Sequence, residues 1–145
     1  MNQFRTPAGR SILAMVAANS IFLTLNGLFM IADPKTWYEM VPGVINTGFY
    51  NQHFIRDIGI VQLLLGIAFV AGCFRPRERL VLWGAATIWL IAHAIFHLWE
   101  VAVGICGPST LLRDFPAVTL PAIIGLVAIT FLRINNQAGH QQPDG

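Results

Sequence analysis

Two groups of ionisable side chains stand out because each falls in a stretch that is otherwise apolar. The first group is His53, Arg56 and Asp57, and the second is His93, His97 and Glu100. Spacings of three and four residues place the members of each group on one face of a helix. Ionisable groups at membrane depth are costly and are more often functional than incidental. Both groups are therefore candidates for a functional site.

The second group has the spacing of a metal site. His-x-x-x-His puts two imidazoles on one helical face, and Glu100 continues that face. Asp57 or His53 would supply the remaining ligand from a neighbouring helix. Imidazole and carboxylate ligands suit zinc, iron, copper or nickel. The sequence thus predicts a transition-metal site made of His93, His97, Glu100, Asp57 and His53.

Two other interpretations of the same residues stay open. His53 facing His97 would give the paired axial ligands of a haem iron, although His53 falls close to the expected membrane surface. Alternatively the polar residues are structural: Arg56 would pair with Asp57, Glu100 or Asp114, and Arg113 with Asp114 would cap the same side. Breaking a buried ion pair costs about 3–5 kcal/mol, so such a network would hold the packing without binding anything.

Composition places these groups in a membrane protein. Hydrophobic residues make up 55% of the 145 residues and charged residues 11%, and the mean hydropathy is +0.62. Because each spanning helix needs about 20 apolar residues, we expect an all-α bundle of four transmembrane helices, near residues 11–32, 53–74, 80–104 and 116–132. These spans would form one domain, residues 1–134, followed by a polar tail, residues 135–145.

The connection between the first two expected spans, residues 33–50, is rich in Trp and Tyr, which favour the headgroup level. We expect it to lie along the interface. Most basic residues fall on one side of the expected membrane, the side of both termini. The positive-inside rule then predicts cytoplasmic termini, in the inner membrane if the source is bacterial. A net charge of +2 gives no indication of nucleic-acid binding.

Helix geometry predicts that the two polar groups meet. In antiparallel spans joined by a short loop, Asp57 would lie beside His97 and Glu100 at matching depth, since each residue rises about 1.5 Å. Arg113 and Asp114 fall on the same outer side. The inner half of the spans is almost purely apolar, which favours an outward-facing pocket over a channel and argues against a transporter of protons or small solutes. Cys73 and Cys106 fall on opposite sides of the membrane, so we expect no disulfide.

Three segments carry a resemblance: residues 42–59, with N-Q-H-F-I-R-D-I-G at their end, residues 93–100, H-A-I-F-H-L-W-E, and residues 113–116, R-D-F-P. Together they resemble a group of small four-helix bacterial membrane proteins that has no assigned activity. The resemblance implies the fold but no substrate. It singles out a shared polar set: His53, Arg56, Asp57, His93, His97 and Asp114.

The sequence supports two functional hypotheses of different kinds. In one, the outward-facing pocket binds a transition metal for metal handling or membrane redox chemistry. In the other, the protein is an accessory subunit of a larger membrane complex, or a homo-oligomer, and its polar cluster is structural. No phosphate-binding loop, dinucleotide fingerprint or nucleophile elbow occurs, so the catalytic motifs of soluble enzymes add no third hypothesis.

Overall fold

The computed structural model describes residues 3–140 and is all-helical. Four helices in this part of the chain are long and apolar enough to cross a membrane: Pro7–Ala32, Gln52–Phe74, Arg79–Ala102 and Ser109–Gln137. The first three are α1, α3 and α4. The fourth combines α5 (Ser109–Asp114), the π-helical turn η3 (Phe115–Thr119) and α6 (Leu120–His140). The predicted four-helix transmembrane bundle is confirmed.

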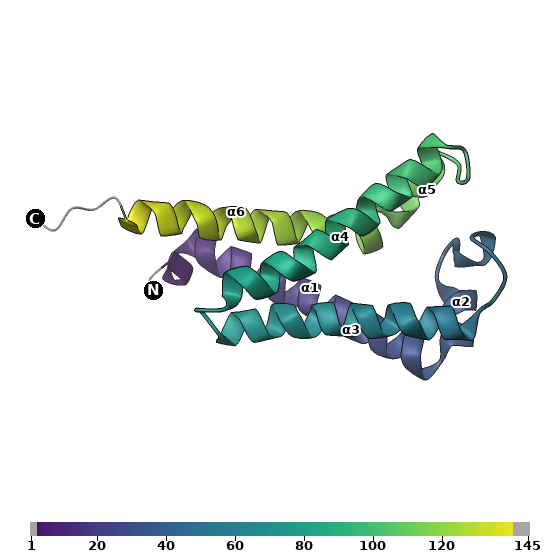
Figure 1. Ribbon diagram of the computed structural model, residues 1–145, viewed down its shortest axis with the longest axis horizontal. Coiled ribbons are helices and arrows are strands. Elements are labelled where there is room, and N and C mark those ends of the chain that lie inside the picture. The colour runs from purple at the N-terminus through teal and green to yellow at the C-terminus, as the bar shows by residue number, and fades with distance from the viewer. Residues whose placement is uncertain (1–2, 141–145) are drawn as a thin grey trace, which may run out of the picture.

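Short elements complete the bundle. The first turn is η1 (Gln3–Arg5), and α2 (Pro34–Met40) and η2 (Val44–Asn46) lie between the first two spans. The start of α1, the last turns of α6 and the α3–α4 turn lie at one end of the bundle, which we call the terminal end (Figure 1). The other end carries α2, η2 and α5 and is called the distal end. Cys73, at the end of α3, and Cys106, beyond α4, are free thiols at opposite ends.

Side-chain caps fix where the helices begin. The Thr6 hydroxyl accepts from the Gly9 N–H at 3.0 Å, and Pro7 follows it as the first residue of α1. The Asn51 side chain accepts from the Phe54 N–H at 3.1 Å at the start of α3. Such oxygens satisfy amides that have no partner inside the helix. Asp33 caps α2 in the same way, and its hydrogen bonds with Thr36 hold the pKa of the Asp33 carboxyl below its usual range.

The closest helix contact joins α1 to α3. A Cβ placed on Gly27 would lie 2.6 Å from the Gly59 carbonyl oxygen and 2.7 Å from the Leu63 nitrogen, so only glycine fits there. About two turns nearer the terminal end, the Ser20 hydroxyl donates to the Gly66 carbonyl at 3.0 Å. Small residues and interhelical hydrogen bonds are the usual basis of close packing between membrane helices. The α1–α3 pair is therefore a closely packed unit along most of its length.

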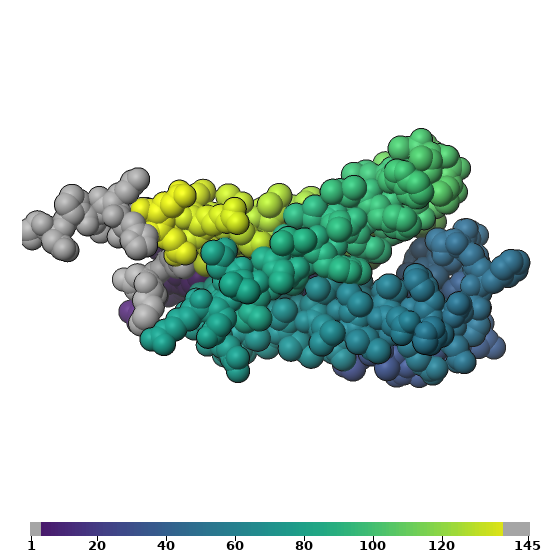
Figure 2. Space-filling model, viewed as in Figure 1, coloured from purple at the N-terminus to yellow at the C-terminus, as the bar shows by residue number. Residues whose placement is uncertain are grey.

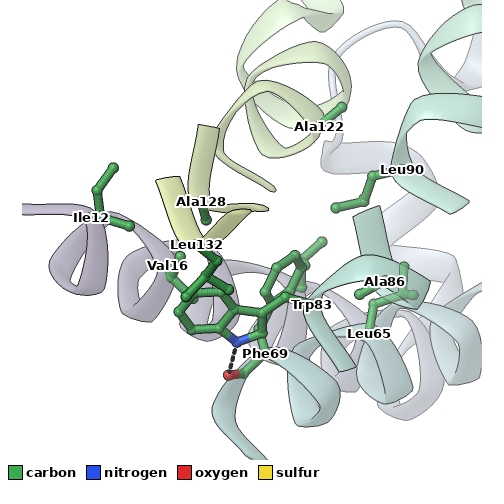
Figure 3. Packing of buried hydrophobic residues seen from close by; sticks show 11 residues of the cluster. Ile12, Val16, Leu65, Phe69, Trp83, Ala86, Leu90, Ala122, Ala128 and Leu132 are labelled. Atoms are coloured by element: carbon green, nitrogen blue, oxygen red, sulfur yellow. Dashed lines mark hydrogen bonds between the residues drawn. The ribbon is translucent and has the colours of Figure 1, made fainter. Parts of the chain in front are cut away.

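A second packed region lies at the terminal end and centres on Trp83 of α4. The Trp83 ring is fully buried, and its indole N–H donates to the Phe69 carbonyl of α3 at 3.0 Å (Figure 3). Arg79 donates to the last carbonyls of α3, those of Gly72 at 2.7 Å and Cys73 at 2.8 Å. These bonds satisfy groups that the end of α3 leaves without partners. They fix α4 to α3 at its first turns.

The fourth span differs from its predicted boundaries. The sequence predicts a helix start at Pro116 after a turn at residues 105–115, yet the helix begins at Ser109 and runs to His140. Pro116 has no N–H and does not end the helix; the chain makes a π turn there, with the Leu120 N–H donating to Phe115. At the far end, α6 continues into the predicted polar tail, and residues 141–145 lie outside the described part of the chain.

The α1–α3 contact predicts a contrast between two glycines. Gly27→Ala should lower the free energy of unfolding by about 1–3 kcal/mol, the usual cost of overpacking. Gly84→Ala is the control: nothing lies within 4 Å of a Cβ there, and alanine favours a helix by about 1 kcal/mol over glycine. Unfolding in mixed detergent micelles, followed by circular dichroism, measures both. Equal stability of the two variants would contradict the glycine contact.

Candidate functional site

The candidate site lies on the distal half of α4. Buried residues of α4 end at Leu90, and none of residues 91–102 is buried within the chain. In this half α4 leans away from α3 and runs beside α5 (Figure 1). The space-filling view shows a notch between the α5 end and the segment that holds α2 and η2 (Figure 2). Both histidines of α4 and its glutamate fall in this half.

His97 lies between two carboxylates. Its Nδ1 atom is 3.4 Å from an Asp114 oxygen, at the end of α5, and 4.0 Å from a Glu100 oxygen, one turn along α4. The side chains of His97, Asp114 and Glu100 are 26%, 18% and 17% exposed, so all three are partly shielded. Electrostatic interactions between groups shielded in this way are screened less by salt than those on an open surface. His97 thus links α4 to α5.

Aromatic rings continue the site toward the membrane centre. His93 packs edge-on against His97, with ring centroids 4.8 Å apart and planes at 79°. On its other side His93 stacks on Trp89, with centroids 4.9 Å apart and planes at 20°. The two imidazoles and the indole therefore form a continuous row along one face of α4. The row joins the carboxylates to the buried part of the helix.

Arg113 connects the site to the loop between α2 and α3. Its guanidinium donates to both oxygens of Asp114, at 2.6 and 3.1 Å, which is the strong two-bond arrangement of arginine with a carboxylate. A Cβ at Gly43 would collide with this guanidinium, and Gly43 has a φ of +85°, a conformation that favours glycine. The Pro42-Gly43 pair marks a turn, but nothing in it indicates an arginine as neighbour.

The first polar group has other partners than those predicted. His53 pairs with Asp57 on the surface of α3 at 3.2 Å, and their side chains are 87% and 55% exposed. Arg56 donates to the Ile31 carbonyl at 3.1 Å and to Gln52 at 3.2 Å. Ile31 is in the last turn of α1, where carbonyls lack partners within the helix. Arg56 caps α1, and within residues 3–140 it forms no ion pair with a carboxylate.

The predicted five-ligand metal site is therefore not assembled. Asp57 pairs with His53, whereas His97 pairs with Asp114 and Glu100. In the described part of the chain no group of three or more His, Cys, Asp or Glu side chains could hold a metal ion. The physical reason is the splayed distal half of α4: α3 is fixed to α1 through their glycines, and α4 follows α5 instead. The predicted Arg113–Asp114 pair is present.

No protein-family model, curated protein or solved structure matches this chain. The resemblance to small four-helix bacterial membrane proteins stays a prediction from the sequence. The function has to be argued from the geometry of the distal site.

The two histidine–carboxylate pairs should contribute differently to stability. In double-mutant cycles, His97→Ala with Asp114→Asn should show a coupling of about 0.5–3 kcal/mol, as residues of one network do. His53→Ala with Asp57→Asn should show about 0.2–1 kcal/mol, since that pair is exposed. Unfolding in detergent micelles measures both cycles. A larger coupling for the His53 pair would contradict the network at the distal end.

Proposed function

We propose that this multi-pass membrane protein binds a transition-metal ion through two imidazoles, His93 and His97, at the distal end. Asp114 and Glu100 orient His97 in this proposal and are not themselves ligands. The observation that carries it is the 3.4 Å distance between His97 Nδ1 and the Asp114 carboxylate. His53 and Asp57, which the sequence analysis included as ligands, pair with each other and are left out.

The carboxylate decides which nitrogen of His97 is available. A carboxylate beside Nδ1 favours the tautomer with the hydrogen on Nδ1, which leaves Nε2 with a free lone pair. Histidines that bind metals almost always give their other ring N–H to a carboxylate, a carbonyl or water. The Asp114 carboxylate lies 3.4 Å from His97 Nδ1, on the side of the ring that this arrangement requires, and Nε2 is the ligand atom in the proposal. His93, one turn away and 4.8 Å between centroids, is the second imidazole.

The same arrangement supports the view that Asp114 orients His97 and does not bind the metal. Arg113 holds both oxygens of Asp114, so this carboxylate is already engaged by a cation. Two imidazoles leave positions around the metal open for a small molecule or for a residue of a partner subunit. Imidazole ligands suit zinc, copper, iron and nickel. An incomplete ligand set of this kind fits metal handling or redox chemistry at a membrane.

Orientation is part of the proposal. Six arginines lie at the terminal end and three basic residues at the distal end, as the sequence positions show: Arg5, Arg10, Arg75, Arg77, Arg79 and Arg133 against Lys35, Arg56 and Arg113. By the positive-inside rule the terminal end faces the cytoplasm. The imidazole pair would then be reached from the outer face, which in a bacterial inner membrane is the periplasmic side.

Metal analysis of protein purified without a histidine tag tests the site. His93→Ala and His97→Ala should each abolish binding of added zinc or copper, and Asp114→Asn should weaken it about 10–100-fold, the usual effect of losing an orienting partner. His53→Ala is the matched control and should bind as the unaltered protein does. Equal metal content in the unaltered protein and in a His93→Ala/His97→Ala variant would refute the proposal.

A second candidate is supported by the unpacked distal half of α4. Phe96 and Trp99 stack on each other, with centroids 5.8 Å apart, and both are about half exposed. As an accessory subunit, the protein would present this face to another membrane protein, and the His97–Asp114–Arg113 network would only fix α5 against α4. The two candidates differ in which side chains they require.

Purification in a mild detergent separates the candidates. A stoichiometric partner that is lost with Phe96→Ala/Trp99→Ala but kept with His93→Ala/His97→Ala would favour the accessory role. The exposed Ile88→Ala on the same helix, closer to the terminal end, is the control and should keep the partner. A lone monomer or homodimer that binds metal would contradict the accessory role.

A further inference from the structure

A groove runs along the outer surface of the bundle between α4 and α6, in the terminal half of both helices. Its lining is apolar except for two residues: Leu80, Gly84, Thr87, Ile88, Ile91, Leu126, Ile129 and Arg133. Ile88 and Leu126 are 70% and 51% exposed, so the groove opens outward rather than into the bundle. It runs from near the middle of α4 toward the terminal end, away from the imidazole pair.

The side chains of the protein leave this groove unfilled. Nothing lies within 4 Å of a Cβ at Gly84, whereas at Gly125 a Cβ would meet the Thr87 side chain. The helices thus touch at Thr87 and Gly125 and leave space beside Gly84. The volume is about 210 Å³, several times the ~30 Å³ of a water molecule, with walls that suit hydrocarbon.

The length of the groove matches one leaflet of a bilayer. From Leu80 to Ile91 the helix rises about 16 Å at 1.5 Å per residue. Half of a hydrocarbon core that is about 30 Å thick is about 15 Å. An acyl chain that lies in the groove would therefore run from the membrane surface at the terminal end to the membrane centre.

Charge identifies the headgroup. Arg133 stands at the end of the groove where the helices reach the terminal surface, and its side chain is exposed. Within residues 3–140 it forms no ion pair. Arginine is the side chain best suited to the two-bond recognition of phosphate. Arg10, Arg75 and Arg77 add positive charge at this end, where Glu78 is the one acidic residue in the described part of the chain.

We propose that the α4–α6 groove is a binding site for one anionic phospholipid of the leaflet at the terminal end. Its acyl chain lies along Gly84, Ile88 and Leu126, and its phosphate is bound by Arg133. The juxtaposition that carries the proposal is an unfilled apolar groove of one-leaflet length that ends at an arginine with no ion-pair partner within residues 3–140. The site does not depend on the imidazole pair, and it stands or falls separately from metal binding.

The test compares lipid selectivity in nanodiscs of phosphatidylcholine with and without phosphatidylglycerol. Native mass spectrometry counts the phosphatidylglycerol that stays bound to protein released from the mixed nanodiscs. Arg133→Gln should reduce retention about tenfold, the effect of losing a hydrogen bond to a charged group. Gly84→Leu should reduce it similarly by filling the groove. Glycerol phosphate, which has no acyl chain, should not compete.

Two matched controls separate the groove from general electrostatics. Arg75→Gln removes an arginine of the same end that does not line the groove, and Val81→Leu enlarges an exposed side chain next to it. Both should retain phosphatidylglycerol as the unaltered protein does. An equal loss in Arg75→Gln and Arg133→Gln, or no loss in Gly84→Leu, would overturn the proposal. Circular dichroism and gel filtration confirm that each variant is folded; if Arg133→Gln is not, Arg133→Lys replaces it and should show a smaller loss.

Discussion

The close approach of α1 to α3 is the contact on which the rest of the structure depends. Because Gly27 and Gly59 bring the two backbones together, these helices form a pair that leaves little freedom to α3. The polar start of α3 stabilises this helix pair, because Arg56 donates a hydrogen bond to the Ile31 carbonyl at the end of α1. In a bilayer such contacts have no hydrophobic driving force, so packing and hydrogen bonds between helices carry the association.

The other two spans attach to this pair mainly at the terminal end. Arg79 donates to the last carbonyls of α3 and Trp83 to the Phe69 carbonyl. Asn19 of α1 donates to the Pro121 carbonyl of the fourth span at 3.3 Å. Beyond Leu90 the distal half of α4 has no such attachment to α3 and is joined to α5 through His97, Asp114 and Arg113. A rigid end and a loosely attached end are thus combined in one small bundle. Local opening concentrates where few buried contacts exist, and here that is where the ionisable side chains lie.

Much of the fold could be predicted from sequence because its determinants are local. Apolar runs of the right length for four spans are visible in the residues themselves. The site could be predicted only in part. Helical spacing correctly put His93, His97 and Glu100 on one face of α4. Which side chains of other helices they meet depends on how α3 and α4 diverge, and the spacing within one helix gives no information on that. The predicted contact with Asp57 depended on α3 and α4 remaining in contact along their full length. The contact between Gly43 and Arg113 could not be predicted either, since the two residues are distant in the chain.

The π turn at residues 115–119 has a consequence for the evolution of this protein. A π turn holds one residue more than the helix around it needs, and each residue of an α-helix advances the chain by about 100°. Deleting a single residue there would restore a regular helix and rotate Asp114 by that angle relative to α6. Its carboxylate would leave His97, and the link between α4 and α5 at the distal end would be lost without any change to either residue. The rotation of α5 about the helix axis, which the extra residue of the π turn beside Pro116 sets, therefore determines the site as much as its side chains do.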